Sequence, residues 1–538
     1  MAPSFDAIVI GAGFAGLRAL HTLRARGLSV LVLEASDDVG GVWHFNRYPG
    51  ARCDVESYDY SYRFSSELEQ EWRWSERYAT QPEILRYIRH VVDRFDLRRH
   101  IQFSTPMQSA RFDEETSVWS IEGADGRHWV TDRLILAMGQ LSTPKASTYP
   151  GQEVFGGQIV YSANWPRNCV DYDGKRVAII GTGSSGVQMT PVIARSAAHL
   201  TVFQRTANFS IPAANVPVTD EEDRAVKAAY PERREAARNS PSGLGFVPDT
   251  RSAVDVPDDE REAAFEKAWH RLGFGFALTF KDILLNQAAN DTAADFARRK
   301  IAEQVQDPVV REQLTPRGFA FGTRRPSVDS GYFASFNRDN VTLVDISATP
   351  IEEFTEAGIR TSDAEYPFDL VIYATGFDAF TGSLLKPEIV GRDGVTLSQK
   401  WAAGPRSFLG MAVHGFPNLF IVVGPGSPSL LSNVLLSSEE QIDWLADLFE
   451  YCKVRGIREV EATAQSEQDW VDTVNARASE TLYPNTASFY TGAEMPGKPR
   501  VFMVYSGGVR GYRRILERTA ASGYDGLTLL AADRKEIA

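Results

Sequence analysis

Two short apolar runs, each followed directly by a glycine-rich loop, stand out in the pattern of hydrophobic and polar positions. Residues 7–10 and 177–180 carry only apolar side chains. Runs of this length, ending at glycine, predict buried strands. Each loop has the spacing GxGxxG and leads into a helix-compatible stretch; the first contains Gly11, Gly13 and Gly16, and the second consists of Gly181, Thr182, Gly183, Ser184, Ser185 and Gly186.

This strand–loop–helix pattern is typical of dinucleotide binding. The first glycine permits a tight turn, the second lets the backbone approach a pyrophosphate, and the third lets the helix pack close to the sheet. The N-terminus of the helix then faces the anion. We therefore predict two nucleotide-binding units, the alternative being two glycine-rich turns that merely close βα units.

The residues after the next strand differ between the two units. The run 30–33 ends at Glu34, whose carboxylate can accept hydrogen bonds from both hydroxyls of an unmodified ribose. The run 200–203 is followed instead by Gln204, Arg205 and Thr206, with no acidic residue. The cation of Arg205 and the hydroxyl of Thr206 suit a ribose 2′-phosphate. The first unit is therefore predicted to bind FAD and the second NADPH.

The rest of the chain predicts an α/β fold with two dinucleotide-binding, Rossmann-like domains and a helical insertion. We expect an FAD-binding domain in residues 1–144, with a capping box at Thr80–Glu83 opening a helix. An NADP-binding domain is expected from 150–217 and 319–380, interrupted by a helical insertion at 218–318. Residues 381–538 are expected to return to the FAD-binding domain.

Composition and charge narrow the function classes. The 538 residues carry a net charge of −13, which argues against nucleic acid or an anionic membrane as a partner. Cys53, Cys169 and Cys452 form no CxxC pair, which excludes dithiol reductases with the same two-nucleotide layout. With no long apolar run and a first strand near Phe5, we expect a cytoplasmic protein. We predict no metal site.

Two longer motifs resemble the signatures of the Baeyer–Villiger monooxygenase family. Residues 155–166 match F-x-G-x-x-x-H-x-x-x-W-P except that Tyr161 stands where the family has histidine. The second signature, G-x-W-x-x-x-x-[FY]-P-G-x-x-x-D, is complete in Gly41, Trp43, Tyr48, Pro49, Gly50 and Asp54. The resemblance spans nearly the whole chain and is weakest in the helical insertion.

The resemblance implies a set of site residues. The family's catalytic arginine falls on Arg325, and the carboxylate that positions it falls on Asp54; taken alone, each is an ordinary surface cation or turn residue. The leucines and valine of a pocket-shaping loop fall on Leu430, Leu431 and Val434. Cofactor contacts are expected from Gly41, Trp43, Arg52, Asp54 and Tyr60 on the FAD side, and from Thr182, Gln188, Arg205, Thr206, Arg324 and Phe489 on the NADPH side.

The implied activity is NADPH- and O₂-dependent oxidation of ketones to esters or lactones through a flavin peroxide, by a monomer. Trp165 favours this ketone-oxidising branch. Phe489 and Glu494 replace a tryptophan and an asparagine of the family, and Phe489 can equally be a core residue. Two alternatives stay open: a sulfide- or amine-oxygenating flavin monooxygenase, and a flavin- and NADPH-binding sensor without oxygenation.

Overall fold

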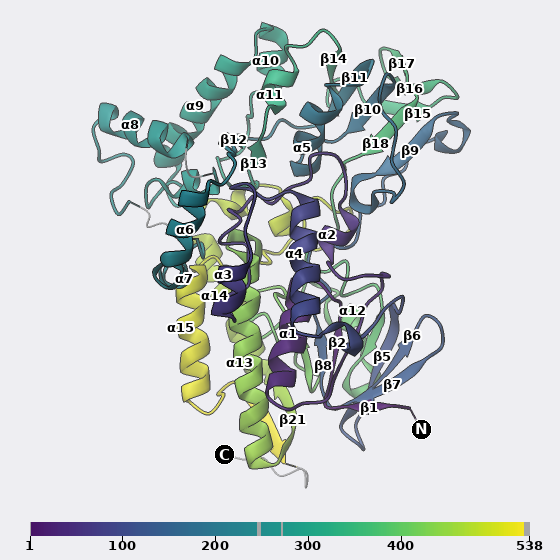
Figure 1. Cartoon of the computed structure of the whole chain (residues 1–538), viewed down its shortest axis with the longest axis vertical. Helices are drawn as coiled ribbons and strands as arrows, with labels where there is room; N and C mark the ends of the chain where they lie inside the picture. Colours follow the sequence, from purple (N-terminus) through teal and green to yellow (C-terminus); the bar gives the residue numbers. More distant parts are fainter. Residues whose placement is uncertain (1, 245–248, 271–272, 532–538) are drawn as a thin grey trace.

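The computed structural model, which describes residues 2–244, 249–270 and 273–531, contains two five-stranded parallel sheets at opposite ends of an elongated molecule (Figure 1). The first sheet has the strand order β20-β8-β2-β3-β4. Ile8 on the central strand pairs with Leu31 on one side and Leu134 on the other, so the predicted apolar run lies in the middle of the sheet. Its strands are β2 (Ala7–Ile10), β3 (Val30–Leu33), β4 (Ile101–Gln102), β8 (Leu134–Leu136) and β20 (Leu419–Ile421).

Helices from both ends of the chain cover this first sheet. The helix after the first glycine loop, α1 (Phe14–Ala25), packs against the long helix α13 (Val434–Arg455). Ion pairs join them, since Arg18 contacts the buried Glu439 and the half-exposed Asp443. Other elements here are α2 (Val42–Phe45), α3 (Ser66–Glu71), α4 (Gln81–Arg94), α14 (Ala464–Ser479), α15 (Gly508–Ala521), β21 (Ile457–Ala462) and β22 (Leu527–Ala531).

A second, mixed sheet borders the first and has the order β1-β7-β6-β5-β19. Its inner face shares a hydrophobic core with the parallel strands, in which Trp119 and Ile8 are both fully buried. Its strands are β1 (Ser4–Phe5), β5 (Met107–Asp113), β6 (Val118–Gly123), β7 (His128–Thr131) and β19 (Glu388–Val390), with α12 (Leu397–Lys400) beside β19.

The other parallel sheet is built around the second apolar run, in the order β14-β11-β10-β18-β9. Val177 on β10 pairs with Leu200 of the next strand on one side. On the other side it pairs with Leu370, which lies far along the chain. The strands are β9 (Gln158–Tyr161), β10 (Arg176–Ile180), β11 (His199–Gln204), β14 (Val341–Asp345) and β18 (Leu370–Tyr373); β15 (Ile351–Phe354), β16 (Gly358–Thr361) and β17 (Glu365–Pro367) form a small antiparallel sheet beside them. Two parallel nucleotide-type sheets confirm the predicted α/β fold class.

The segment 218–318 is helical but does not form one unit. Its first helices, α6 (Asp220–Ala228) and α7 (Tyr230–Asn239), lie against the first sheet's helices, where Arg238 of α7 pairs with Glu440 of α13. Its later helices, α8 (Asp258–Trp269), α9 (Gln287–Gln304) and α10 (Pro308–Leu314), contribute Phe265 and Phe296 to the core of the second sheet. Residues 245–248 and 271–272 of this segment, like 1 and 532–538, lie outside the described residues.

One local prediction is wrong. Thr80 is the N-cap of α4, but its side chain makes no capping hydrogen bond. Glu83 does not reach back to it, because its carboxylate accepts from the backbone and hydroxyl of Ser75 at 2.9 and 2.7 Å. A tertiary contact has therefore replaced the local capping box.

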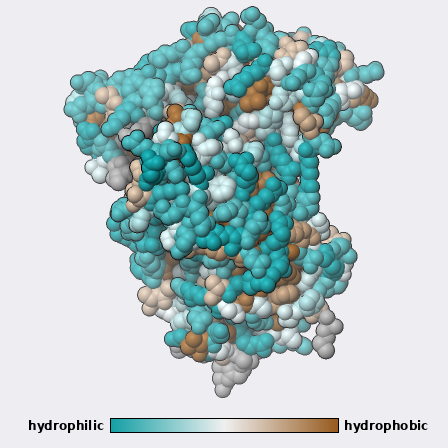
Figure 2. All heavy atoms as spheres, viewed as in Figure 1, coloured by the Kyte–Doolittle hydropathy of each residue, from teal (hydrophilic) through white to brown (hydrophobic). Residues whose placement is uncertain are grey.

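The surface is largely hydrophilic on the face that Figure 2 shows, with hydrophobic residues scattered among polar ones. Among the described residues, no helix has both the length and the apolar composition needed to cross a membrane.

Candidate active site

The first glycine loop has the geometry that the motif predicts. Gly11 has φ +104°, a conformation that favours glycine, at the point where β2 turns into α1. A Cβ on Gly16 would lie 1.8 Å from the carbonyl oxygen of Gly11, so only glycine fits where the helix crosses the loop. A Cβ on Gly41 would lie 3.1 Å from the Cα of Gly13, so two glycine segments meet face to face. This bare backbone fits a pyrophosphate.

Glu34 lies beside this loop at the end of β3 and is buried. Its carboxylate accepts from the backbone N–H of Ala12 at 2.5 Å and from the backbone and hydroxyl of Ser36 at 2.7 Å. Each carboxylate oxygen can accept more than one hydrogen bond, so these contacts orient the group without exhausting it. The contact with a ribose stays a prediction.

Trp43 and Tyr60 form the wall next to the glycine segments. The indole N–H of Trp43 donates to the Tyr60 hydroxyl at 3.1 Å, and the rings meet edge to face. Burial raises the pKa of Tyr60 well above its ordinary value, so the phenol stays neutral. The amide of Gln81 donates to the carbonyl of Trp43 and fixes the backbone of α2.

The second glycine loop repeats the first. Gly181 has φ +113°, and a Cβ on Gly186 would lie 2.1 Å from the Gly181 carbonyl oxygen. A Cβ on Gly183 would meet nothing within 4 Å, which leaves that position open toward a ligand. The hydroxyl of Thr182 donates to the Thr206 carbonyl at 3.2 Å and ties the loop to the end of β11.

The loop's two serines reach other segments. Ser184, the first residue of α5 (Ser184–Ile193), lies 3.5 Å from the hydroxyl of Ser327 on β13 (Ser327–Asp329), which pairs with β12 (Ser210–Pro212). The hydroxyl of Ser185 lies close to the phenol of Tyr48. The second loop is thus connected to both the first unit and the segment that carries Arg325.

Arg205 and Arg324 form a cationic pair at the edge of the second unit. Arg324 lies over the ring of Phe319 and donates to the Ala487 carbonyl at 3.1 Å. Burial lowers the pKa of Arg324, and the charge of Arg205 lowers it further. Neither arginine forms an ion pair with a carboxylate of the described residues. Two adjacent, unneutralised guanidiniums fit a ribose phosphate.

Glu494, a departure from the family pattern, lies close to this pair. Its carboxylate forms an ion pair with Lys145 at 2.8 Å. Its negative charge also acts on Arg324 and opposes the lowering of that pKa, with a larger effect than Arg205 has.

Gln188 on α5 joins the two units rather than standing free beside the second loop. It accepts from the Tyr48 hydroxyl at 2.9 Å and donates to the Arg52 carbonyl at 3.1 Å. A Cβ on Gly50 would lie 2.4 Å from the Gln188 carbonyl oxygen, so the backbone of this loop rests directly on α5. The guanidinium of Arg52 faces Glu76 at 3.2 Å.

Arg325 and Asp54 form the central ion pair of the site. Nε and Nη2 of Arg325 donate to the two carboxylate oxygens of Asp54 at 3.1 and 3.0 Å, which is the bidentate arrangement. Burial alone would lower the pKa of Arg325, but the Asp54 carboxylate and the Tyr490 phenol together more than offset this and raise it above its usual value. The guanidinium therefore keeps its charge at any working pH.

Two further groups touch Arg325 that the sequence did not indicate. Nη1 donates to the Leu430 carbonyl at 2.6 Å, and the buried phenol of Tyr490 hydrogen-bonds to the guanidinium. Burial raises the pKa of Tyr490, so it acts here as a neutral partner. Tyr490 follows Phe489 in the sequence, but nothing in the motif says that it turns toward Arg325.

The segment that carries Arg325 is held at both sides. The amide of Asn208 donates to the Arg325 carbonyl at 2.9 Å, and the hydroxyls of Thr323 and Thr486 meet at 2.7 Å in the interior. Arg325 therefore links the second unit to the C-terminal segment, while Asp54 belongs to the first unit.

An apolar wall lies next to this ion pair. Leu430 and Leu431, in the short 3₁₀ helix 429–431, pack with Phe489 and Tyr490 in one cluster. Phe489 also stacks near Phe380, at 6.2 Å between ring centroids. Val434 packs instead against the core of the first sheet, so the structure groups only two of the three predicted pocket residues.

Tyr161 is half-buried and Trp165 is buried, and both take part in packing interactions. Tyr161 stacks on Tyr373 at 5.0 Å, and Gln152 hydrogen-bonds to both phenols. The backbone N–H of Trp165 donates to the Phe45 carbonyl at 3.2 Å and attaches the segment after β9 to the first unit.

Comparison with known families and proteins agrees with this geometry. A family model described as pyridine nucleotide-disulphide oxidoreductase matches residues 8–226. A Baeyer–Villiger monooxygenase from Pseudooceanicola batsensis is 42% identical over 97% of this chain and 96% of its own length. A phenazine N-monooxygenase from Lysobacter antibioticus is 39% identical over 98% and 97%.

Solved structures match over the same extent. An oxidized steroid monooxygenase bound to NADP is 50% identical, with a TM-score of 0.95, covering 98% of this chain and 100% of the other. A complex of OTEMO with FAD and NADP is 39% identical, with a TM-score of 0.95 and the same two coverages.

Proposed function

The chain belongs to the Baeyer–Villiger monooxygenase family, as an FAD-containing, NADPH-dependent enzyme, and we propose that Arg325 is its catalytic residue. The observation that carries the proposal is the bidentate Arg325–Asp54 pair, formed between the two nucleotide-binding units and contacted by Tyr490 and the Leu430 carbonyl. The reaction inserts an oxygen atom beside a ketone carbonyl, and we propose O₂ as its source.

The two glycine loops are proposed to hold the cofactors. The segments around Gly13 and Gly41 would bind FAD, and the second loop with Arg205 and Arg324 would bind NADPH, with the cationic pair on the 2′-phosphate. Bound FAD, reduced by NADPH, supplies the activated oxygen. The corresponding domains are proposed as 1–144 with 381–538 for FAD, and 150–217 with 319–380 for NADP.

Arg325 supplies a fixed positive charge where negative charge develops on oxygen. A preorganised cation stabilises such charge without reorganising during the reaction, and a guanidinium does not lose its proton. Asp54 is a positioning residue, since it holds two of the guanidinium's N–H groups and offsets the cost of burying the cation. Tyr490 and the Leu430 carbonyl fix the remaining orientation.

The substrate is proposed to be an apolar ketone bound against Leu430, Leu431 and Phe489, because these residues form one cluster beside the ion pair. The motif segments resemble phenylacetone monooxygenase, which favours an aryl ketone. The phenazine N-monooxygenase among the relatives keeps a heteroatom-oxygenating activity as the second candidate. A non-oxygenating sensor is disfavoured, since it would not need a buried, bidentate guanidinium.

The test is the Arg325→Ala variant. It should bind FAD, because the glycine loops are elsewhere, yet form ester from an aryl ketone about a hundred- to a thousandfold more slowly, the usual cost of one oxyanion donor. Arg317→Ala, which removes an exposed arginine paired with Glu312, is the control and should behave like the unmodified enzyme. Ester formation by Arg325→Ala at the unmodified rate would contradict the assignment.

A further inference from the structure

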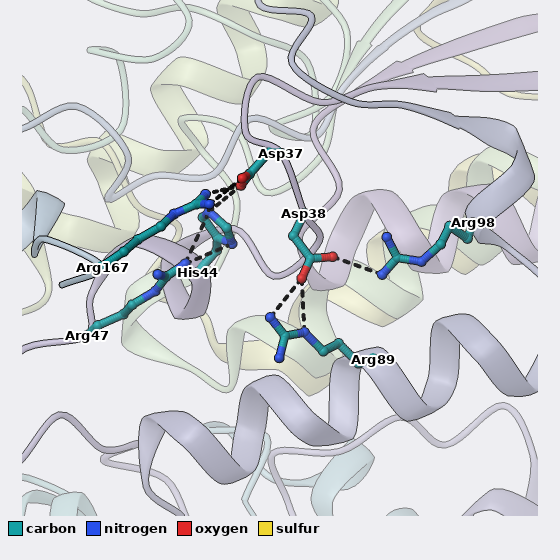
Figure 3. Close-up of a pocket in the computed structure, with 7 residues that line it drawn as sticks. All are labelled: Asp37, Asp38, His44, Arg47, Arg89, Arg98 and Arg167. Atoms are coloured by element: carbon teal, nitrogen blue, oxygen red, sulfur yellow. Dashed lines mark hydrogen bonds and ion pairs between the residues drawn. The ribbon is translucent and has the colours of Figure 1, made fainter.

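A second polar site lies outside the residues assigned to the cofactors and the substrate. It is a cavity of about 360 Å³ in which the loop after β3, helix α2 and the end of α4 face the linker after β9. Figure 3 shows two aspartates, each turned toward a separate group of basic side chains. The lining consists of Asp37, Asp38, His44, Arg47, Arg89, Arg98 and Arg167.

The lining carries more positive than negative charge. Asp37 pairs with Arg167 and with His44, while Asp38 pairs with Arg89 and Arg98 at 2.8 and 2.9 Å. Burial lowers the pKa of His44, and the neighbouring arginines lower it further, so its ring is neutral near pH 7. Four arginines against two aspartates leave two positive charges in excess.

Arg47 holds one of the two excess charges, and the other arises because Arg89 and Arg98 share the single carboxylate of Asp38. The guanidinium of Arg47 touches only the His44 ring nitrogens, at 3.2 and 3.3 Å, and forms no ion pair with a carboxylate of the described chain. Its Nε is buried without a hydrogen-bond partner. Burial, Arg167 and Arg89 all lower the pKa of Arg47, as expected for a cation in a positive field. A buried donor without a partner costs free energy unless a ligand satisfies it.

We propose that this cavity binds a phosphate group, bridged between Arg47 and Arg167. A phosphate dianion matches the excess of two charges, and its oxygens can accept hydrogen bonds from more than one guanidinium fork at once. Arg167 lies between β9 and β10, two strands of the second parallel sheet, whereas Arg47 belongs to the first unit. A bound phosphate would therefore cross-link the two units.

The site is separate from the ribose reader on the same loop. The Glu34 carboxylate faces Ala12 and Ser36, while Asp37 and Asp38 point to the arginines of the cavity. The proposed cofactor contacts and this cavity use different side chains, so binding here is tested on the enzyme with both cofactors present.

Isothermal titration calorimetry on the FAD-loaded enzyme, saturated with NADP⁺ and at constant ionic strength, tests the proposal. One arm uses inorganic phosphate and the other uses AMP. Saturable binding of either supports the site, and tighter binding of AMP identifies the ligand as a phosphate carried on a small molecule. Failure of both to bind beyond a chloride titration would overturn it.

The variants locate the binding. Arg47→Gln should weaken phosphate about ten- to a hundredfold, the range for losing one charge-assisted contact. Arg167→Gln should also weaken it, and because this side chain is 56% exposed its loss leaves folding intact. Arg317→Gln, an exposed and ion-paired arginine elsewhere, should bind phosphate like the unmodified enzyme. Equal affinity in all three variants would refute the assignment.

Discussion

Replacing Asp54 by asparagine separates the charge of the central ion pair from its shape. The side chains of Arg325 and Asp54 are only 22% and 26% exposed, so water can replace the lost contacts only in part. A charge-assisted hydrogen bond contributes roughly 1.5–3 kcal/mol, and asparagine keeps one neutral acceptor toward the guanidinium. We expect a loss of about 1–3 kcal/mol, which corresponds to roughly a 5- to 150-fold lower kcat/KM for ketone oxidation.

Stopped-flow absorbance of the flavin together with ester analysis measures this effect. Asp54→Asn should lower the kcat of ester formation with little change in the KM for NADPH, because Arg205 and Arg324 are untouched. Asp125→Asn breaks an exposed pair with Arg127 and is the control, expected within about twofold of the unmodified enzyme. If both variants form ester at the unmodified rate, the positioning role of Asp54 is refuted.

Three further predictions address other parts of the molecule. Arg205→Ala should raise the KM for NADPH about ten- to a hundredfold more than that for NADH, measured by steady-state kinetics; equal effects would contradict it. Gly186→Ala should lower the melting temperature because its Cβ meets a carbonyl at 2.1 Å, whereas Gly183→Ala should leave it unchanged and weaken only NADP⁺ binding. Burial lowers the pKa of His21 to about 4, so between pH 6.5 and about 4 the unfolded chain binds one proton more than the folded chain, and the stability decreases as the pH is lowered through this range. In urea unfolding, the His21→Phe variant should lose less stability over this range than the unmodified enzyme. An identical pH dependence of the two proteins would exclude His21 as its source.

Local sequence determines much of the site. Both glycine loops, their strands and the positive φ of Gly11 and Gly181 follow from spacing, because a turn of this kind depends on residues a few positions apart. Only the family resemblance predicts the contact between Arg325 and Asp54, because 271 positions separate them and no local rule brings them together.

The remaining contacts depend on tertiary packing. Tyr490 hydrogen-bonds to Arg325, and the hydroxyl of Ser75 donates to the carboxylate of Glu83. Both contacts depend on how separate segments pack together, which the periodicity of the sequence does not predict. Val434 matched the pocket motif as well as Leu430 did, yet it packs into another core, because α13 begins at that residue and turns it toward the first sheet. Spacing predicts the loops, but the partners of long side chains require the three-dimensional fold.

Ketone oxygenation is tested most directly by product analysis of the unmodified enzyme supplied with NADPH, an aryl ketone and isotopically labelled O₂. Mass spectrometry should show an ester that carries a single labelled oxygen atom beside the former ketone carbonyl, with NADPH consumed in equal amount. Conversion of a sulfide to its sulfoxide, with no ester formed from aryl, cyclic or steroidal ketones, would contradict the account.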